Sequence, residues 1–311
     1  MKNKRSQLQS LILMAILMLT ALSGLSEILA ASEFPVSVTD DLGRNVTLSR
    51  QPQSIISLAP SNTEILFALG LGEKVIAVSE YCNYPLGAQN KAKIGGFSTV
   101  NIEKVVSLKP DLVLASCGVQ KAVVKELERL GLTVIALDAK SIEEVLENIR
   151  LVGKAAGQPE AARELRVNLE RRVKAVTDKT KGLLPSQRPT IFYEVQYDPL
   201  MTAGPGTFIN DLIHSAGGVN IASDAAAKYP VYNLETLIKR NPEVIIISFW
   251  HGSITASVEG VKSRQRWQNV DAVKNNRVYG INADIVSRPG PRIVDALEKM
   301  ARFIHPELFK K

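Results

Sequence analysis

Short apolar runs alternate with amphipathic segments along much of the chain. Runs of four or five apolar residues between turn residues are typical of strands buried on both faces of a sheet, and apolar residues three or four positions apart predict helices. Before residue 140 we predict strands at 54–58, 75–78, 112–115 and 133–137, and helices at 102–108 and 121–130. This alternation favours a parallel α/β sheet with helices on both faces.

Two local signals stand at the start of this region. Residues 36–48 read as a β-hairpin with its turn at 40–43. Ser61 and Glu64 have the spacing of a capping box, in which the two side chains satisfy the free backbone N–H groups of a first helical turn. We therefore predict a helix that this pair opens and that Gly70 ends.

A long segment without Gly or Pro, residues 160–181, interrupts the alternation after a helical pattern at 142–152. Its apolar residues recur at intervals of three and four positions, so we predict one helix roughly 33 Å long. Beyond it we predict strands at 190–194, 244–248 and 278–281, and helices at 208–216, at 234–239 and from 291 onward. The predicted fold is α/β, with two similar lobes with parallel sheets joined by one long α-helix. The predicted limits are 33–140 for the N-terminal lobe, 141–187 for the connecting helical segment and 188–311 for the C-terminal lobe.

An internal repeat supports two lobes of the same design. Residues 101–116 read NIEKVVSLKPDLVLAS, and residues 233–248, at an offset of 132, read NLETLIKRNPEVIIIS. The same offset carries Phe97 onto Tyr229. Duplication explains sixteen positions aligned without a gap, although convergence on a common helix–turn–strand unit is the alternative. Two such lobes should face each other across a cleft, with the carboxyl ends of the strands at its lips.

The N-terminal residues have the order of a secretory signal peptide, for which we predict the limits 1–32. Lys2, Lys4 and Arg5 precede an uncharged apolar run at 11–25, and small residues follow at 30–32. Fifteen apolar residues are fewer than the about 20 that span a bilayer, although a retained anchor is the alternative. The mature protein is therefore expected in the periplasm or at the extracytoplasmic face.

Composition excludes several classes of protein. The chain is 45% hydrophobic and 22% charged, which argues against a disordered chain and against a polytopic membrane protein. Two cysteines and three histidines without metal-ligand spacing predict no metal site. Without residues 1–32 the chain keeps 35 basic and 30 acidic residues, and no basic stripe predicts binding to nucleic acid.

Several segments together resemble a known family. These are DDLGRNVTL at 40–48, SLAPSNTEILFALGLGEKVIAV at 57–78, the two repeats, and RPGPRIVDALEKMARFIHPE at 288–307. They resemble the periplasmic substrate-binding proteins of ABC importers for metal chelates (vitamin B12, haem and ferric siderophores). EYCNYP at 80–85 and RPGPR at 288–292 are most similar to the cobalamin-binding members. The resemblance independently implies two α/β lobes bridged by one long helix, the helical-backbone class III of these receptors.

The resemblance implies a carrier with no enzymatic activity and no cofactor of its own. It is expected to work as a monomer that captures a corrinoid and delivers it to a membrane permease dimer. A ferric siderophore or haem carrier of the same importer class is the alternative ligand assignment. A chelatase-like enzyme is disfavoured because no acid/base pair with a nucleophile is recognisable, and a surface adhesin or sensor domain is a further alternative.

Aromatic residues follow the predicted strands of both lobes, where a flat and largely apolar macrocycle needs aromatic faces and a few hydrogen bonds. The predicted ligand-binding residues are Tyr81, Tyr84, Phe97, Ser116, Met201, Tyr229, Trp250, His251 and Arg292. The alternative is that these aromatic residues are ordinary core. For His251 in particular, a hydrogen-bonding role and axial ligation of a metal centre are both open.

Two glutamates occupy equivalent places in the repeats. Glu103 and Glu235 each stand two residues after an asparagine that can cap a helix, and an acidic residue there stabilises the helix through its dipole. The resemblance implies a second role, since members of this family present one glutamate per lobe to arginine pockets on the permease. Both roles can hold together.

Cys82 and Cys117 each follow a predicted strand. The ends of parallel strands lie at one edge of a sheet, and an exported protein can form disulfides. A Cys82–Cys117 disulfide and two free thiols are both compatible with the sequence, while a thiolate ligand to a metal is the least favoured alternative.

Overall fold

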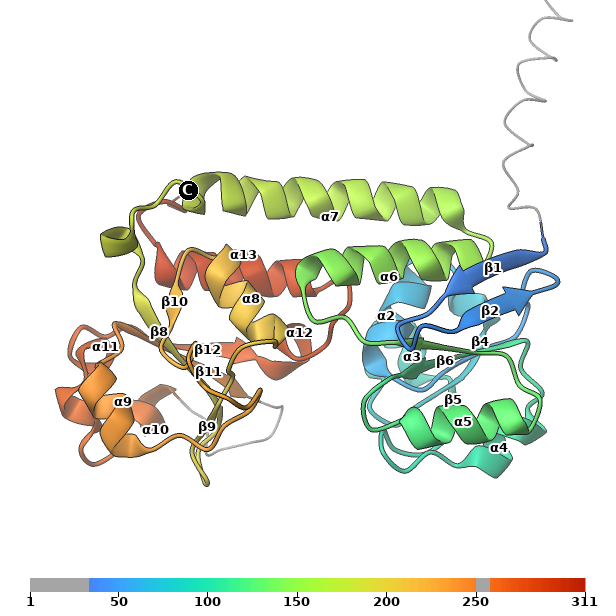
Figure 1. Cartoon of the computed structure of the whole chain (residues 1–311), viewed down its shortest axis with the longest axis horizontal. Helices are drawn as coiled ribbons and strands as arrows, with labels where there is room; N and C mark the ends of the chain where they lie inside the picture. The colour runs from blue at the N-terminus through green and yellow to red at the C-terminus, as the bar shows by residue number, and fades with distance from the viewer. Residues whose placement is uncertain (1–33, 250–257, 311) are drawn as a thin grey trace, which may run out of the picture.

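The computed structural model describes residues 34–249 and 258–310. Two lobes, each built on a parallel sheet, lie side by side, and the long helix α7 (Pro159–Thr180) runs along one side of both (Figure 1). The predicted fold class is therefore confirmed. The predicted signal peptide and the residues Trp250 and His251 lie outside the described residues. No helix within the described ranges is both long and apolar enough to cross a membrane.

The sheet of the N-terminal lobe has the strand order β5–β4–β3–β6–β7, and all its pairs are parallel. Its strands are β3 (Ile55–Ser57), β4 (Val75–Val78), β5 (Ala92–Lys93), β6 (Leu112–Ser116) and β7 (Val134–Leu137). Its helices are α2 (Pro60–Ala68), α3 (Leu86–Gln89), α4 (Ile102–Ser107), α5 (Lys121–Arg129) and α6 (Ile142–Ala155), with the 3₁₀ turn η2 (Gly72–Lys74). The predicted hairpin is also present, as the antiparallel pair of β1 (Val36–Thr39) and β2 (Asn45–Leu48).

The sheet of the C-terminal lobe has the order β10–β8–β11–β12 in parallel, with β9 antiparallel on β8. Its strands are β8 (Thr190–Gln196), β9 (Met201–Thr202), β10 (Val219–Asn220), β11 (Val244–Phe249) and β12 (Val278–Asn282). The helices are α8 (Phe208–Ser215), α9 (Leu234–Arg240), α10 (Val258–Lys262), α11 (Asp271–Lys274), α12 (Ala283–Val286) and α13 (Ile293–Ile304), with the 3₁₀ turns η3 (Pro185–Gln187) and η5 (Trp267–Asn269). If the short strands β5 and β9 are left out, four strands remain in each sheet, and they lie in the same order in both. The second strand along the chain is at one edge, and the first, third and fourth strands follow it across the sheet.

The internal repeat folds alike in both lobes. Lys109 and Asn241, which the offset of 132 superimposes, both adopt a left-handed backbone, with φ of 45° and 43°. This turn redirects the chain from helix α4 or α9 into strand β6 or β11. A second matched pair, two positions further on, also makes equivalent contacts. Asp111 accepts a hydrogen bond from the Ser54 backbone N–H (3.0 Å), and Glu243 accepts one from the Thr190 backbone N–H (2.8 Å). The shared geometry favours duplication over convergence.

The predicted capping box of α2 is wrong. The helix begins at Pro60, Ala59 is its N-cap residue, and no side chain caps it. Proline suits this place because it has no N–H group to satisfy and its φ is already helical. Ser61 and Glu64 consequently lie inside the helix, and the Glu64 carboxylate contacts the other lobe. The predicted end is correct, since Gly70 follows the helix with a φ of +74°.

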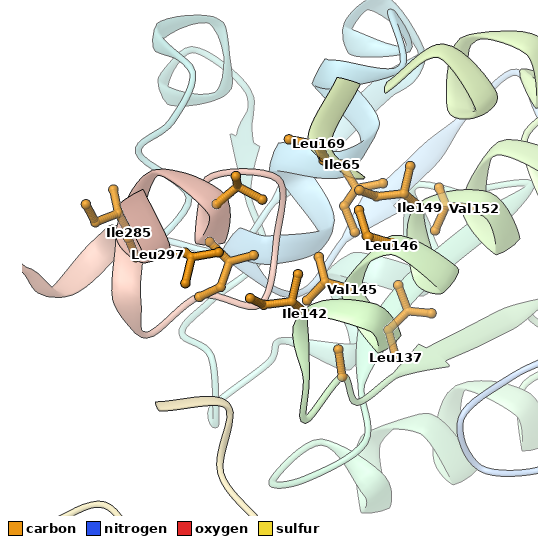
Figure 2. Packing of buried hydrophobic residues seen from close by; sticks show 14 of the residues in the cluster. Ile65, Leu137, Ile142, Val145, Leu146, Ile149, Val152, Leu169, Ile285 and Leu297 are labelled. Atoms are coloured by element: carbon orange, nitrogen blue, oxygen red, sulfur yellow. The ribbon is translucent and has the colours of Figure 1, made fainter. Parts of the chain in front are cut away.

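One hydrophobic core extends through both lobes. It includes Ile65 of α2, Leu146 of α6, Leu169 of α7 and Leu297 of α13 (Figure 2). Helices α6 and α7 approach closely, since a Cβ atom on Gly153 would stand 2.2 Å from that of Ala162. Helix α7 also packs on α13 of the C-terminal lobe. The long helix is thus a shared wall of the core rather than a free linker, and the predicted lobe limits at 140 and 187 stay a prediction.

Candidate ligand-binding site

A cavity of about 380 Å³ lies where the carboxyl ends of the N-terminal strands face the C-terminal lobe. Its N-terminal wall consists of the first turn of α2, the loops after β4, β5 and β7, the end of β6, and Asn148 of α6. The C-terminal lobe contributes residues 287–289, which follow α12. Ligands of parallel α/β sheets bind at this edge, so the cavity is a candidate binding site.

A second hollow of about 190 Å³ adjoins the first. Asp138, Ala139 and Pro289 line both, so the two form one cleft between the lobes. The C-terminal wall of the second hollow comes from residues 206–208 at the start of α8 and from Lys228 and Tyr229. The cleft predicted from the repeat is therefore present, and its two parts have different walls.

Four predicted ligand-binding residues lie at this cleft. Tyr81, Phe97 and Ser116 line the larger cavity, and Tyr229 lines the second hollow from the opposite lobe. Tyr81 is 59% exposed, so it can contact a ligand. Burial raises the pKa of Tyr229, so its phenol stays protonated at neutral pH and can donate a hydrogen bond.

Three other predicted residues lie elsewhere. Met201 pairs with Gln196 in the short β9 ladder and lines neither hollow. The Arg292 guanidinium stacks on the Tyr84 ring at 3.9 Å from its centroid, and neither side chain lines either hollow. Arg292 is instead bound to a carboxylate of the other lobe, so its geometry is that of an inter-lobe contact.

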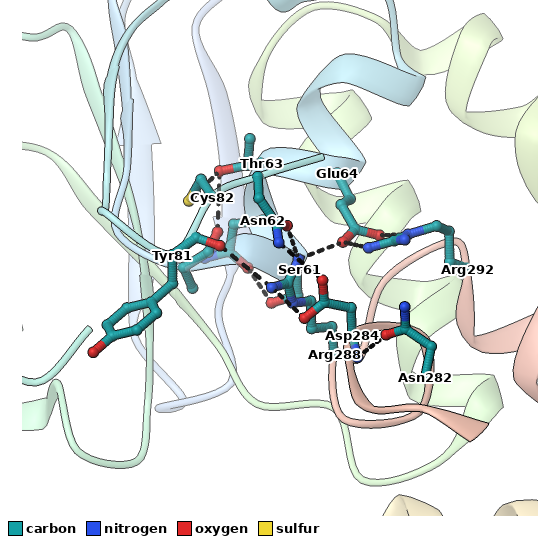
Figure 3. Close-up of polar contacts among 12 residues, drawn as sticks. Ser61, Asn62, Thr63, Glu64, Tyr81, Cys82, Asn282, Asp284, Arg288 and Arg292 are labelled. Carbon is teal, nitrogen blue, oxygen red and sulfur yellow. Dashed lines mark hydrogen bonds and ion pairs between the residues drawn. The ribbon is translucent and has the colours of Figure 1, made fainter. Parts of the chain in front are cut away.

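That contact belongs to a group of charged and polar side chains beside the cavity, most of them buried, which we call the inter-lobe polar cluster (Figure 3). Its members are Glu64 and Asn83 from the N-terminal lobe and Asp284, Arg288 and Arg292 from the C-terminal lobe. The Glu64 carboxylate accepts two hydrogen bonds from Arg292, at 2.8 and 2.6 Å. Burial alone would lower the pKa of Arg292, but the hydrogen bonds and charge of Glu64 outweigh it and raise the pKa.

Arg288 connects this cluster to the cavity wall. Its guanidinium lies 2.6 Å from Asp284 and 3.5 Å from Glu64, and it donates to the Asn83 side chain (2.6 Å) and the Tyr81 carbonyl oxygen (3.3 Å). Figure 3 shows the Tyr81 ring pointing away from these contacts. A residue of one lobe therefore holds the backbone from which an aromatic side chain of the other lobe enters the cavity.

Most members of this cluster have no predicted role. Asn83 and Arg288 stand inside the segments EYCNYP and RPGPR, so the resemblance contained them without a role. Glu64 is predicted to be part of a helix cap. A buried Glu–Arg pair separated by 228 positions leaves no local signal. A signal that could mark the cluster is the charge of Glu64 directly before the apolar run at 65–69.

The possible disulfide between Cys82 and Cys117 is wrong, because both cysteines are free and buried. Each thiol follows its own strand, β4 or β6, and β3 lies between these strands. Two strand spacings are about 9.5 Å, beyond the about 7 Å that a disulfide spans between Cα atoms. The Cys82 sulfur instead accepts a hydrogen bond from the Thr63 hydroxyl at 3.1 Å. Burial and the nearby Asp138 raise the pKa of Cys117 to about 12.

The two matched glutamates are both exposed, in the first turns of α4 and α9. Asn101 accepts a hydrogen bond from the Lys104 N–H at 2.9 Å, and Asn233 accepts one from the Glu235 N–H at 2.7 Å, so the predicted caps are present. Both helices lie on the side of the molecule away from α7 (Figure 1). The carboxylates of Glu103 and Glu235 are therefore available to a partner on that side.

Within residues 34–249 and 258–310, no group of three or more His, Cys, Asp or Glu side chains is placed to hold a metal ion together. In that part of the chain the cleft is thus lined by aromatic, aliphatic, amide and hydroxyl groups with few charges. Such a lining can bind and orient a molecule through apolar contact and hydrogen bonds.

Comparison with known proteins identifies the family. The model of a family described as periplasmic binding protein matches residues 55–285. An uncharacterised ABC transporter substrate-binding lipoprotein of Bacillus subtilis, YvrC, is 36% identical over 283 residues, which cover 89% of this chain and 88% of that protein. The vitamin B12-binding protein of Vibrio cholerae is 32% identical over 254 residues, 81% of this chain and 89% of its own length.

A solved structure leads to the same family. The periplasmic vitamin B12 binding protein BtuF of Vibrio cholerae superimposes with a TM-score of 0.72 at 30% identity, covering 83% of this chain and 99% of BtuF. The family and these relatives are substrate-binding proteins rather than enzymes. With two matched lobes, a bridging helix and a cleft between them, the chain is a member of the periplasmic binding protein family.

Proposed function

We propose that this protein is an extracytoplasmic carrier that captures a corrinoid, a vitamin B12-like ligand, and delivers it to the permease of an ABC importer. The observation that carries the proposal is the inter-lobe cavity, which is lined in part by aromatic side chains. The chain that contains it is about a third identical to vitamin B12-binding proteins. The protein performs no chemistry on this ligand; it binds it and releases it.

The cavity lining suits a corrinoid in several respects. Tyr81 and Phe97 offer aromatic faces, and Ile65 and Leu137 add aliphatic surface for the flat ring. Ser98 and Ser116 present hydroxyl groups that can bond the amide arms around such a ring. A cleft open between two lobes also accommodates a ligand that is larger than the enclosed volume, because part of the ligand can stay in solvent.

Delivery would use the exposed glutamates. Glu103 and Glu235 stand at equivalent points of two similar lobes, so together they offer an approximately two-fold pair of carboxylates. A dimeric permease presents two equivalent surfaces, and a pair of basic pockets there would match this arrangement. We propose that the carrier docks as a monomer through this side, with α7 facing away.

A ferric siderophore or haem carrier of the same importer class is the second candidate. The observation that favours it is the exposed Tyr81 phenol at the cavity wall, since phenolate oxygen is a ligand for ferric iron in some haem proteins. The enzyme alternative is not retained, because the family and relatives are binding proteins.

Calorimetric titration of the purified mature chain with cyanocobalamin, hemin and a ferric siderophore tests the proposal. We expect near-stoichiometric binding of cyanocobalamin and little heat with the other two ligands. Tight binding of hemin or the siderophore without cyanocobalamin would replace the corrinoid assignment with the second candidate.

Matched variants test whether the ligand binds in this cavity. Phe97→Ala removes an aromatic wall and should weaken cyanocobalamin binding by about 1–3 kcal/mol, or roughly fivefold to 150-fold. Leu184→Ala removes an exposed apolar side chain that lines neither hollow and should leave the affinity unchanged. Equal affinities for the two variants would contradict binding in this cavity.

A further inference from the structure

The second hollow of the cleft differs from the larger cavity in charge. Lys140 of the N-terminal lobe and Lys228 of the C-terminal lobe both line it, with Asp138 as the one acidic residue of its lining. In the larger cavity, Arg288 is the basic residue of the lining, and its guanidinium is already engaged by the inter-lobe polar cluster. The positive charge available to a ligand is therefore concentrated at one end of the cleft.

The loop segment that contains Ala227 and Lys228 packs against the turn at 204–207, just before α8. The backbone N–H of Gly204 donates to the Lys228 carbonyl oxygen at 2.7 Å, and a Cβ atom on Gly204 would stand 2.5 Å from the Ala227 carbonyl oxygen. A Cβ atom on Gly206, whose φ is +72°, would lie 3.8 Å from the Lys228 Cε atom. The Lys228 side chain thus extends along the 204–207 turn at the rim of the hollow.

The charges around the two ammonium groups leave them able to accept an anion. The Lys140 ammonium stands 3.7 Å from the Asp138 carboxylate, an exposed and loose ion pair. Within the described residues, no ion pair or hydrogen bond is found for the Lys228 ammonium. Asp211, in the first turn of α8, uses its carboxylate to accept from the Ile142 N–H at 3.0 Å. The start of α8 adds the partial positive charge of a helix N-terminus.

We propose that the second hollow binds the phosphodiester group of the nucleotide arm of a corrinoid, held between Lys140 and Lys228, while the corrin ring occupies the larger cavity. This inference rests on the proposed function and adds a subsite to it. Two like charges on opposite walls repel each other across an empty hollow, and one anion between them relieves that repulsion and bridges the lobes. An apolar cavity joined to a cationic hollow matches a ligand with an apolar body and an anionic arm.

The experiment compares two corrinoids that differ in this arm. Cyanocobalamin carries the phosphodiester, whereas dicyanocobinamide keeps the corrin ring and lacks the nucleotide arm. Both are titrated calorimetrically against the wild type, Lys140→Met, Lys228→Met and the double variant, at low and high salt. Lys125→Met, on the exposed face of α5, is the matched control for loss of a surface lysine. Thermal unfolding verifies that each variant is folded.

The expected loss is specific to one ligand. The double variant should bind cyanocobalamin about threefold to twentyfold more weakly, as expected for two exposed charge contacts, with little change for dicyanocobinamide. High salt should weaken cyanocobalamin binding in the wild type and not in the double variant. Equal losses for the two ligands, or none for cyanocobalamin, would overturn this inference alone. Failure of the wild type to bind either corrinoid would overturn the proposed function and the inference with it.

Discussion

The ion pair between Glu64 and Arg292 should contribute strongly to stability, because it joins the two lobes away from water. The side chains are 2% and 17% exposed, and two hydrogen bonds connect them. Removing one partner of a buried pair costs about 3–5 kcal/mol, because the other charge is left without compensation. In Glu64→Gln the amide still accepts one hydrogen bond and Asp284 still faces Arg288, so we expect a loss of about 2–3 kcal/mol.

A double-mutant cycle separates the pair from its surroundings. Arg292→Met removes the guanidinium but keeps much of its apolar length, and Glu64 retains a weaker contact with Arg288 at 3.5 Å. If the pair acts as a unit, the double variant should be about 1–2 kcal/mol more stable than the sum of the two single losses predicts.

Urea unfolding followed by circular dichroism measures the free energy of unfolding for each variant. Fluorescence of the buried Trp267 reports the C-terminal lobe separately, and coincident transitions would justify a two-state treatment. Glu126→Gln breaks an exposed pair on α5 and should leave the free energy unchanged within error. A loss for Glu64→Gln as small as that of the control, or strictly additive losses in the cycle, would refute the reasoning.

Three further predictions concern other parts of the molecule. Burial would raise the pKa of Asp40, but its paired arginine and backbone N–H groups outweigh this and lower the pKa below the usual value of 3.8. This carboxylate therefore stabilises the fold above about pH 4 and loses its effect as the pH falls through the lowered pKa, so the stability difference between wild type and Asp40→Asn should shrink in acid. Cys82 and Cys117 should resist a thiol reagent in the native protein and both react in denaturant; one disulfide by mass spectrometry would contradict the free thiols. Replacing Glu103 and Glu235 together with Ala should abolish uptake into vesicles that contain the permease while calorimetry finds the ligand affinity unchanged, and normal uptake would exclude the docking role.

The helices and strands that the sequence predicts well are those with a clear local periodic pattern. Strand β4 has the predicted limits, Val75–Val78, because a short apolar run between turn residues has few alternatives. Helix α7 begins and ends within one residue of its predicted limits, since Pro159 opens it and no Gly or Pro interrupts it. Two-residue strands such as β9 were missed, because Met201–Thr202 carries no periodic signal and pairs only in the folded lobe.

The candidate site was predictable where it follows strand ends or the internal repeat. Tyr81, Phe97 and Ser116 come after strands or end one, so the rule for parallel sheets leads to the cavity that they line. Asn148 lines the same cavity from helix α6 and was missed, because its position depends on how that helix packs. Arg292 is predicted to bind the ligand, yet its partner Glu64 stands on the other lobe, a relation that local patterns do not contain.

The hydrophobic core that runs uninterrupted from one lobe to the other has a consequence for transport. Two lobes that share one core should keep nearly the same outline whether vacant or occupied, so the spacing between Glu103 and Glu235, the carboxylates proposed for docking, would carry little information about the load. We therefore expect vacant receptors to compete with occupied ones for the importer, which added ligand-free protein would reveal as slower uptake. The importer would then have to sense its cargo directly at the mouth of the cleft.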